Sequence, residues 1–464
     1  MPILREIPSF DFEMPIVIVG GGACGCVAAL AAADAGADAI ILERDAKPEG
    51  NTSLSGGQII GAGTKLQAAA GVEDKPAYLT QDLLSKARNQ CDATIAQAIA
   101  EASGPTVDWL VERHGIEMTP MTKFSYPNHS RPHIHMPAGF DGSALHAMLL
   151  QAVAKAGVDI ATSAPVTSLF ADDQDRIRGV QITRPDGTLE NIGCEALILA
   201  TNGFGGNPAL VAKYIPQIAD APHLGHSGNQ GDAVLWGEGL GASLKDLGSF
   251  QGHGAVCTPH MTRLNWGVVA QGGIQVNARG KRFSHENAGY SEQGLIVRSQ
   301  PGNVAWAIWD ERCEKAAGPM LCHQTSWSQG AIKRIPDVAG LAAQIGCDVA
   351  TLQSTFDEIA ALGARKERDA WGRDFSITPP LEAPFMCAKI TGALFHTQGG
   401  LEVDGEGRVL RPDGSRFPNL FAGGGAARGL SGPADWGYLS GSGLLVAINL
   451  GRLAGDAASA LVKR

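Results

Sequence analysis

A glycine-rich turn lies between two apolar segments near the start of the chain, and this order limits the folds open to it. The run Ile16–Val19 is apolar and β-branched, and the turn Gly20–Gly25 follows it directly. An alanine-rich stretch, 27–37, predicts a helix. A second apolar run, 39–42, closes on the acid Glu43. A strand, a glycine turn, a helix, a strand and an acid predict the first unit of a dinucleotide-binding α/β fold.

Each part of this turn has a role in such a fold. Gly20 permits the tight turn, Gly22 lets the backbone approach a pyrophosphate, and Gly25 lets the helix pack closely on the strand. The N-terminal N–H groups of the helix carry partial positive charge and suit a phosphate. Glu43 is placed to accept hydrogen bonds from the adenosine ribose. These residues predict a dinucleotide site but do not decide between FAD and NAD.

Composition excludes several other classes of protein. Glycine accounts for 60 of the 464 residues without a Gly-X-Y repeat, which excludes a collagen-like chain. The formal net charge is −10 with no lysine- or arginine-rich run, which argues against nucleic acid and anionic membranes as partners. No stretch reaches the ~18 consecutive apolar residues of a transmembrane helix. Nine cysteines without a C-x-x-C pair indicate no disulfide framework and no zinc site, so we expect a reduced, cytoplasmic protein without a metal.

Later segments favour FAD. Residues 49–57 are small and hydroxyl-rich, which suits a pyrophosphate and a flavin edge. Residues 195–207 and 419–425 each predict an apolar strand that runs into a glycine turn. Residues 440–443 open an apolar helix over 444–455, whose N-terminus would face the electron-rich pyrimidine end of a flavin.

Taken together, these segments resemble the fumarate reductase/succinate dehydrogenase flavoprotein superfamily, which includes the 3-ketosteroid dehydrogenases. The segments that carry the resemblance are Gly-Asn-Thr at 50–52, ALILATNGFGGN at 196–207, the turn at 228–232, NARGKRF at 277–283 with Glu286, and HTQGGL at 396–401. The resemblance implies an α/β fold in which a Rossmann-like FAD-binding domain, 1–254 and 386–464, is interrupted by an α+β cap domain, 255–385. In this family the substrate is held between cap and flavin.

The resemblance also implies one FAD that is not covalently bound. The quinone-linked members have a histidine where this chain has Asn51, and that histidine bonds to FAD. The family usually has a glutamate where Gly425 stands, so one ribityl contact must come from elsewhere. The residues expected to bind FAD are Gly20, Gly22, Ala23, Cys24, Gly25, Glu43, Arg44, Asn51, Thr52, Ser53, Ser55, Gly56, Gly57, Val166, Ala200, Thr201, Asn202, Gly203, Gly424, Gly441, Gly443, Leu444 and Leu445.

Two tyrosines stand where fumarate reductases have arginines. The proton-donating arginine of those enzymes lies eight residues after the arginine of the Arg-Phe pair, and counting from Arg282 this position is Tyr290. The carboxylate-binding arginine precedes the last glycine turn, at the position of Tyr438. Without these guanidinium groups a dicarboxylate would lose charge-assisted, bidentate hydrogen bonds. Dicarboxylate reduction is therefore disfavoured.

Tyrosine at both positions is the pattern of the 3-ketosteroid dehydrogenases. By that resemblance Tyr290 is the base that removes the proton α to a ketone. Tyr438, with a backbone N–H near Ser442, donates hydrogen bonds to the ketone oxygen. A phenol with a pKa of ~10 is a natural donor at pH 7 and needs help to act as a base. Tyr126 is a candidate for the proton relay. The alternative for each tyrosine is a buried ring whose hydroxyl is tied to the backbone.

The resemblance thus implies FAD-dependent desaturation of a cyclic ketone, such as a 4-oxocyclohexanecarboxylate-type compound or a 3-oxosteroid, with an unknown electron acceptor. Two alternatives remain open. One is a soluble, fumarate-reductase-like reductase of an unsaturated carboxylic acid. The other is a non-catalytic FAD protein that relays electrons.

The segment 126–135 is the densest polar cluster. Its histidines, His129, His133 and His135, invite a metal, but no carboxylate stands near them in the sequence, so we expect none. Arg131 or His135 would anchor a substrate carboxylate if this segment covers the substrate, and a plain surface loop is the alternative. His396 matches a family position and is a further candidate for contact with flavin or substrate.

Overall fold

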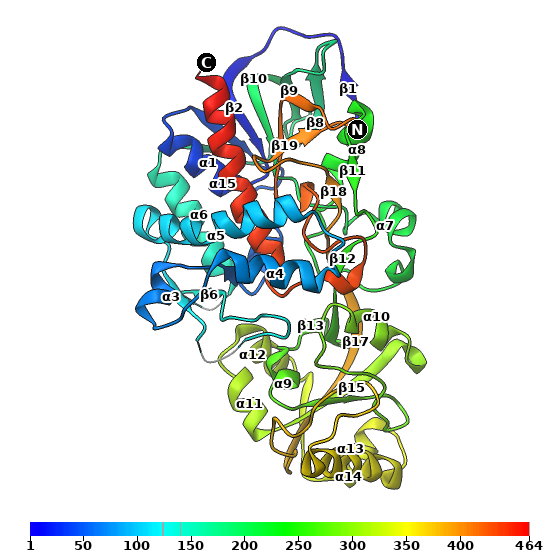
Figure 1. Ribbon diagram of the computed structural model, residues 1–464. Helices are drawn as coiled ribbons and strands as arrows, with labels where there is room; N and C mark the ends of the chain where they lie inside the picture. Colours follow the sequence, from blue (N-terminus) through cyan, green and yellow to red (C-terminus); the bar gives the residue numbers. More distant parts are fainter. Residues whose placement is uncertain (123–124, 140, 464) are drawn as a thin grey trace. The chain divides into compact units, whose positions relative to one another are not determined.

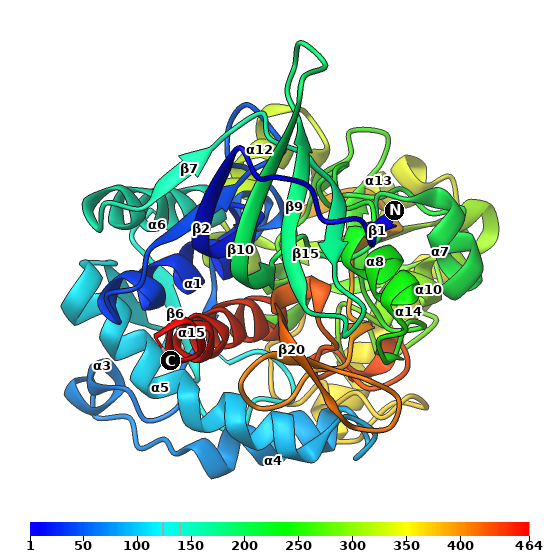
Figure 2. The same cartoon turned by 90° about the horizontal axis from the view of Figure 1, so that it is seen from above.

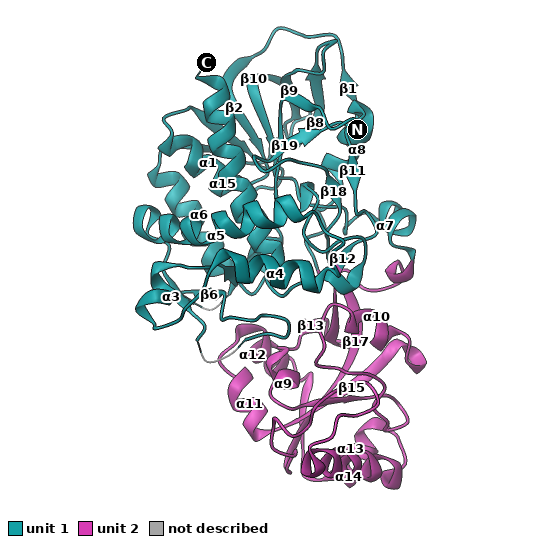
Figure 3. Cartoon of the chain, in the orientation of Figure 1, with its two compact units in different colours: residues 1–216, 225–250, 396–464 teal, residues 217–224, 251–395 magenta. Residues whose placement is uncertain are grey.

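The computed structural model describes residues 1–122, 125–139 and 141–463, and these form two compact units (Figure 3). Unit 1 contains residues 1–216, 225–250 and 396–464, and unit 2 contains residues 217–224 and 251–395. Both units contain helices and strands, so the predicted α/β class is confirmed. The expected cap, 255–385, lies within unit 2, and residues 386–395 also belong to that unit.

Unit 1 is built on a nine-stranded sheet (Figure 1). Its centre is parallel: β10 pairs with β2 and β20, and β2 pairs with β3. Ile16–Val19 and residues 39–42 are buried, because strands of a parallel centre are covered on both faces. The strands of this sheet are β1 (Ile3–Leu4), β2 (Phe12–Val19), β3 (Ala39–Leu42), β7 (Asp159–Ala161), β8 (Val166–Ala171), β9 (Ile177–Thr183), β10 (Leu189–Leu199), β19 (Arg408–Leu410) and β20 (Arg416–Ala422).

Nine α-helices are described in unit 1, and two of them differ in length from the sequence prediction. The first begins at Ala23, because the chain turns helical directly after extended Gly22, and it ends at Asp34. The last begins at Ser442 and continues to Val462. The helices are α1 (Ala23–Asp34), α2 (Asn51–Leu54), α3 (Lys65–Ala69), α4 (Pro76–Lys86), α5 (Ala93–His114), α6 (Gly142–Lys155), α7 (Pro208–Tyr214), α8 (Asp232–Leu240) and α15 (Ser442–Val462).

Helix α15 lies beside α1 in the core of unit 1 (Figure 2). The two backbones approach closely where α15 has glycine: a Cβ at Gly451 would lie 2.5 Å from the carbonyl oxygen of Cys24, and one at Gly455 would lie 2.5 Å from that of Ala28. Helix α15 is long and apolar enough to cross a membrane, but more than half of its apolar window is buried inside the protein. We therefore assign it to the core.

Two small sheets complete unit 1. One joins β4 to β6 and β6 to β5, and the other joins β11 to β18. They are formed by β4 (Ile59–Ile60), β5 (Met118–Pro120), β6 (Ile134–Pro137), β11 (Leu244–Lys245) and β18 (Gly400–Leu401).

Unit 2 contains a six-stranded sheet in which every pairing described is antiparallel. Helix α14 buries Leu352, Phe356 and Ile359 against this sheet. Its elements are β12 (Phe250–Cys257), β13 (Thr262–Arg263), β14 (Ile274–Val276), β15 (Val304–Asp310), β16 (Ile332–Ile335), β17 (Phe385–Thr397), α9 (Gly267–Ala270), α10 (Gln293–Arg298), α11 (Glu311–Ala317), α12 (Leu321–Ser328), α13 (Val338–Ile345) and α14 (Val349–Arg365).

Candidate functional site

A cavity lies in unit 1 beside the carboxyl ends of β2, β3 and β10. This is where open α/β sheets bind dinucleotides. Sequence analysis predicted ten of its lining residues: Gly20, Gly22, Glu43, Arg44, Asn51, Thr52, Val166, Ala200, Thr201 and Asn202. Other residues that line the cavity were not predicted. Those with polar side chains, or from the turn at 228–232, are Asp45, Glu49, His226, Gly228, Asn229 and Asp232. The turn at 228–232 already carried the family resemblance, so the sequence could have indicated Gly228, Asn229 and Asp232.

The glycine turn forms one wall of this cavity. Gly20 has a φ of +109°, which favours glycine, and a Cβ at Gly25 would overlap the carbonyl oxygen of Gly20. The N-cap residue of α1 is Gly22, which has no side chain that could accept a hydrogen bond from the first N–H groups of the helix. Thr52 accepts a hydrogen bond from the N–H of Ala23 at 3.0 Å. Backbone N–H groups at a helix start suit a pyrophosphate.

Glu43 and Arg44 lie at the other side of the turn. Glu43 is buried and accepts hydrogen bonds from the N–H groups of Gly21 (2.8 Å) and Asp45 (2.9 Å). A carboxylate has about four acceptor sites, so Glu43 keeps capacity for a ribose hydroxyl. Arg44 forms an ion pair with Asp45 at 3.0 Å and donates to the carbonyl oxygen of Gly228.

Asn51 and Thr201 fit a dissociable dinucleotide. The side-chain oxygen of Asn51 accepts hydrogen bonds from the N–H of His226 (2.7 Å) and the amide of Asn229 (3.0 Å). An amide gives no covalent bond to a flavin, unlike the histidine of the quinone-linked enzymes. The hydroxyl of Thr201 lines the cavity and is buried with no partner among the described residues. Such a group is suited to a ligand's polar atom.

The other residues predicted to bind FAD do not line this cavity. Cys24 packs against Gly423 and Gly451, and burial raises the pKa of its thiol to about 12, so it acts as a small apolar residue. Ser53 pairs with His146, and Ser55 donates to the carbonyl oxygen of Thr52. The full set outside the cavity is Ala23, Cys24, Gly25, Ser53, Ser55, Gly56, Gly57, Gly203, Gly424, Gly441, Gly443, Leu444 and Leu445.

Polar groups gather at the start of α15. The position of a Cβ on Gly443 would lie 2.9 Å from Cε1 of His396 and 3.4 Å from the hydroxyl oxygen of Tyr438. The rings of His396 and Tyr438 meet edge to face, with centroids 5.7 Å apart. The hydroxyl of Ser442 is buried here without a partner among the described residues. The first N–H groups of a helix have no partner within it, so donors are concentrated at this turn.

Two histidines beside this turn have defined tautomers. The amide nitrogen of Gln398 lies 2.7 Å from Nδ1 of His396 and must donate to it, so the neutral His396 ring carries its proton on Nε2. His129 donates from Nε2 to the carbonyl oxygen of Ser440 at 3.0 Å. Burial lowers the pKa of His129 to about 4, so its Nδ1 is an acceptor, and it has no partner within the described part of the chain.

Tyr290 lies in unit 2 among aromatic rings. Its ring centroid is 5.2 Å from that of His253 and 6.0 Å from that of Trp266, and His253 stacks on Phe395 at 4.9 Å. Its carbonyl oxygen accepts a hydrogen bond from Gly254 of β12. Burial lowers the pKa of His253 to about 3, so this histidine is a neutral ring beside Tyr290.

The cap motif that precedes Tyr290 is held by a buried charge cluster. Glu286 pairs with Arg282 at 2.6 Å and with Arg373 at 2.9 Å, and Arg282 also pairs with Asp369 at 2.8 Å. Burial alone would raise the pKa of Glu286, but the charge of Arg373 and the hydrogen bonds of Arg282 outweigh it and lower that pKa to about 2. The guanidinium group of Arg282 is therefore used in ion pairs with Glu286 and Asp369.

The polar segment near residue 130 differs from expectation. No carboxylate stands near these histidines in the sequence, but the fold brings Asp74 and Asp82 into contact with His133. His135 is fully buried, with Nε2 2.9 Å from the hydroxyl of Thr64 and Nδ1 3.1 Å from the carbonyl oxygen of His133, so both ring nitrogens are engaged within the protein. No group of metal-binding side chains is found in the described residues.

Arg131 and Tyr126 come from the same segment. Arg131 is exposed and stacks on the ring of Tyr78, with its guanidinium carbon 4.6 Å from the centroid. Tyr126 is buried and accepts a hydrogen bond from the amide of Gln58 at 3.0 Å. Contact of either residue with substrate stays a prediction.

Comparison with known proteins agrees with the site. The FAD binding domain family matches residues 15–444. The Shewanella frigidimarina protein named "Probable fumarate reductase Ifc3" is 28% identical over 446 residues, which cover 96% of this chain and 74% of that protein. The 4-oxocyclohex-2-ene-1-carboxylate 5-dehydrogenase of Sinomonas cyclohexanicum is 28% identical over 368 residues, which cover 69% of this chain and 60% of that protein.

A solved structure adds to these relatives. The 3-ketosteroid-Δ4-(5α)-dehydrogenase from Rhodococcus jostii RHA1 is similar with a TM-score of 0.78 and 25% identity, over 99% of this chain and 100% of that one. The predicted resemblance is therefore confirmed, and with it the FAD cofactor. This chain belongs to the FAD binding domain family and is an FAD-dependent oxidoreductase related to the fumarate reductases.

Proposed function

We propose that this enzyme desaturates a cyclic ketone next to its carbonyl group. Tyr290 takes the proton from the α-carbon, and Tyr438 donates a hydrogen bond to the ketone oxygen. Bound FAD supplies the hydride acceptor for the hydrogen of the β-carbon. A 4-oxocyclohexanecarboxylate-type compound and a 3-oxosteroid are the candidate substrates.

The observation that carries this proposal is the position of Tyr438. Its hydroxyl lies at the first turn of α15, where Gly443 leaves room beside it and the helix directs N–H groups to the same place. Negative charge develops on a ketone oxygen as the α-proton leaves, and donors fixed in advance stabilise that charge. The helix N-terminus adds partial positive charge. The hydroxyl of Ser442, which has no partner among the described residues, is a further donor at this turn.

Aromatic rings surround Tyr290 in unit 2. Those of His253 and Trp266 pack on it, and Phe395 stacks on His253. Because His253 is neutral, the help that the phenol needs to act as a base must come from another group. Tyr126, held by Gln58, is the candidate for a proton relay in unit 1.

The names of two similar proteins also support ketone chemistry. One is a dehydrogenase of 4-oxocyclohex-2-ene-1-carboxylate, and the other is a 3-ketosteroid dehydrogenase. The relative named as a fumarate reductase favours the second candidate, reduction of an unsaturated carboxylic acid. Tyrosine at 290 and 438 argues against it, because neither residue offers the bidentate cation that a carboxylate requires. Kinship with oxidoreductases argues against the non-catalytic relay.

The test is anaerobic bleaching of the bound flavin. We expect 4-oxocyclohexanecarboxylate or a 3-oxosteroid to reduce the flavin, and succinate to leave it oxidised. Bleaching by succinate without bleaching by any ketone would reverse the assignment. The electron acceptor is then found by following reoxidation with quinones, dyes and oxygen.

We also propose a cytoplasmic location. All nine cysteines are free, which suits a reducing compartment.

A further inference from the structure

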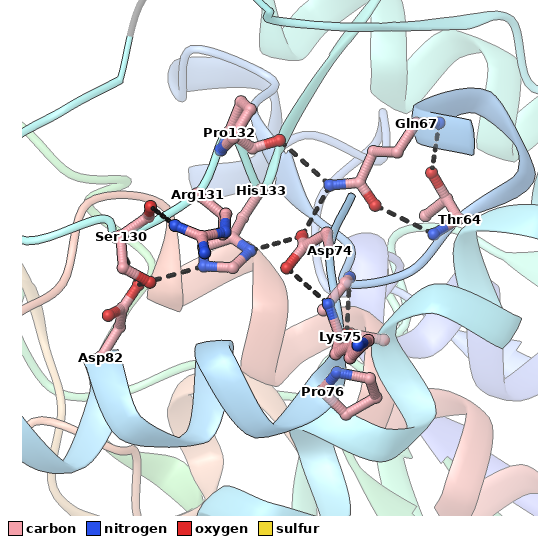
Figure 4. Close-up of polar contacts among 12 residues, drawn as sticks. Thr64, Gln67, Asp74, Lys75, Pro76, Asp82, Ser130, Arg131, Pro132 and His133 are labelled. Atoms are coloured by element: carbon pink, nitrogen blue, oxygen red, sulfur yellow. Dashed lines mark hydrogen bonds and ion pairs between the residues drawn. The ribbon is translucent and has the colours of Figure 1, made fainter. Parts of the chain in front are cut away.

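Three buried ionisable side chains meet between α4 and the residues that precede β6 (Figure 4). His133 lies between two aspartates, with Nδ1 2.6 Å from Oδ2 of Asp74 and Nε2 3.0 Å from Oδ2 of Asp82. Asp74 precedes α4, and Asp82 lies in its second turn. The side chains of His133 and Asp74 are fully buried, and that of Asp82 is nearly so.

The hydrogen bonds fix the charge of this group. Each aspartate also accepts hydrogen bonds from donors other than His133, so neither carboxyl group is placed to donate. Both ring nitrogens of His133 must therefore donate, and only the imidazolium ion can do this. The other donors are the Gln67 amide (2.7 Å) and the Lys75 N–H (2.8 Å) on Asp74, and the Ser130 N–H (2.7 Å) and hydroxyl (3.0 Å) on Asp82.

The titration of neighbouring groups agrees with this geometry. Burial alone would lower the pKa of His133, but the hydrogen bonds and charges of Asp74 and Asp82 outweigh burial and raise it above 6.5. The other titratable groups that face His133 are His129, 5.7 Å away between ring centroids, and His135. Burial lowers the pKa of each to about 4, so both are neutral near pH 7.

The charged group is connected to the start of α15. Ser130 is tied to Asp82, and its neighbour His129 donates to the carbonyl oxygen of Ser440. Ser440 lies between Tyr438 and Ser442, at the turn where the donors to the ketone oxygen gather. A path of hydrogen bonds thus runs from α4 through the 129–133 segment to this turn.

We propose that His133 is a positioning residue, whose imidazolium ion, held by Asp74 and Asp82, keeps the 126–133 segment in place so that His129 fixes the backbone at Ser440. Its effect on catalysis rests on the proposed function, whereas its effect on the order of the segment does not. None of these residues lines the dinucleotide cavity.

The pH window follows from the directions of the pKa shifts. The pKa of His133 is raised, so its contribution is complete below about 6.5 and is lost as pH rises through the higher folded value. Burial alone would raise the pKa of Asp82, but the hydrogen bonds of His133 and Ser130 outweigh burial and lower it. Its contribution is therefore present above 3.8 and lost as pH falls through the lower folded value. The segment is held between these two limits.

The test is hydrogen exchange by mass spectrometry in the holoenzyme carrying His133→Gln, at pH values from 5 to 9 with correction for intrinsic exchange. A neutral amide leaves one aspartate without its donor, so we expect peptides that cover 126–134 to exchange at least about tenfold faster at pH 6. The wild type should show this increase only as pH rises through the raised pKa of His133. The matched control is His323→Gln in unit 2, another buried histidine paired with a carboxylate, Glu314 at 3.0 Å. It should leave these peptides unchanged.

Turnover supplies the second readout. We expect His133→Gln to lower kcat about 10- to 100-fold with FAD still bound, because misplacement of a donor by about 1 Å costs up to that much. If that variant does not fold, Asp82→Asn removes one charge only and should shift the alkaline limit of the pH profile to lower pH. The proposal would be overturned if the folded variants exchanged peptides 126–134 at the wild-type rate and kept the wild-type pH profile. If no ketone reduces the wild-type flavin, the proposed function fails while the exchange result still decides the role of His133.

Discussion

Tyr438 and Tyr290 are held by two different kinds of surroundings. In unit 1, Tyr438 precedes the first turn of α15, where Gly441 has a φ of +89° and Gly443 leaves room for the tyrosine and His396. In unit 2, Tyr290 is placed by packing against the rings of His253 and Trp266, and a hydrogen bond from Gly254 fixes its backbone. Backbone conformation places Tyr438, whereas packing of side chains, together with one backbone hydrogen bond, places Tyr290.

This difference matches the tasks that we propose for the two residues. A hydroxyl that stabilises a developing charge must stand at one place before the charge appears, and a helix terminus on the main sheet provides that rigidity. A base needs a site in which its charged and neutral forms are both accessible. His253 beside Tyr290 is neutral and adds no charge to this site. Substitutions at Tyr290, Tyr438 and Gly443 each alter one of these two surroundings.

The largest effect is expected from Tyr290→Phe. The phenyl ring keeps the packing against His253 and Trp266 but has no group that accepts a proton. General-base catalysis typically contributes about 10²- to 10⁴-fold, so we expect kcat to fall about a thousandfold. The measurement is single-turnover bleaching of the flavin by a ketone substrate. The yellow colour of bound FAD is the control for folding, and retained turnover in a yellow variant would refute the assignment.

A smaller loss is expected from Tyr438→Phe. The ring still packs edge to face on His396, but one donor to the ketone oxygen is removed. Loss of one such donor typically costs about 10²- to 10³-fold, and the helix N–H groups remain, so we expect about a hundredfold loss of kcat. The same bleaching assay measures it. A rise in KM alone, with kcat unchanged, would show that Tyr438 only binds substrate.

The smallest effect is expected from Gly443→Ala. The added methyl group would lie 2.9 Å from Cε1 of His396, so that ring must shift, whereas its distance of 3.4 Å from the hydroxyl oxygen of Tyr438 is an ordinary contact. Misplacement of a group by about 1 Å can cost about a hundredfold in rate, and the shift here is smaller, so we expect about a tenfold loss of kcat/KM. Gly405→Ala is the matched control, since its methyl group would meet only Cβ of Ala98, at 3.7 Å. Equal activities in the two variants would separate Gly443 from the site.

Local sequence predicted the parts of the fold that depend on neighbours along the chain. The strands at 16–19 and 39–42 were predicted because each is a short, continuous apolar run next to the glycine turn or the acid. The predicted bounds of α1 were less accurate, because the helix begins inside the glycine turn, at Ala23 directly after extended Gly22, and not where the alanine-rich stretch begins.

Contacts between distant segments could not be predicted in this way. Asp74 and Asp82 lie 59 and 51 positions before His133, and a search of its sequence neighbourhood did not find them. Cys24 was assigned to the cofactor because it stands in the glycine turn, yet its sulfur lies against Gly423. His135 was a candidate for substrate because its segment was expected to cover the substrate pocket, and Thr64 and His133 contact both of its ring nitrogens.

The sequence by itself determined that this chain folds a strand, glycine turn, helix and strand around a dinucleotide, because each step is local and glycine is required by the backbone. It also has tyrosines at the two positions where the resemblance to fumarate reductases implies arginines, and these tyrosines are the basis of the ketone chemistry that we propose. Only the tertiary structure decided which polar side chains are paired. The charge of a buried histidine depends on carboxylates that other segments bring to within 3 Å, as Asp74 and Asp82 do for His133 and no residue does for His253 among those described.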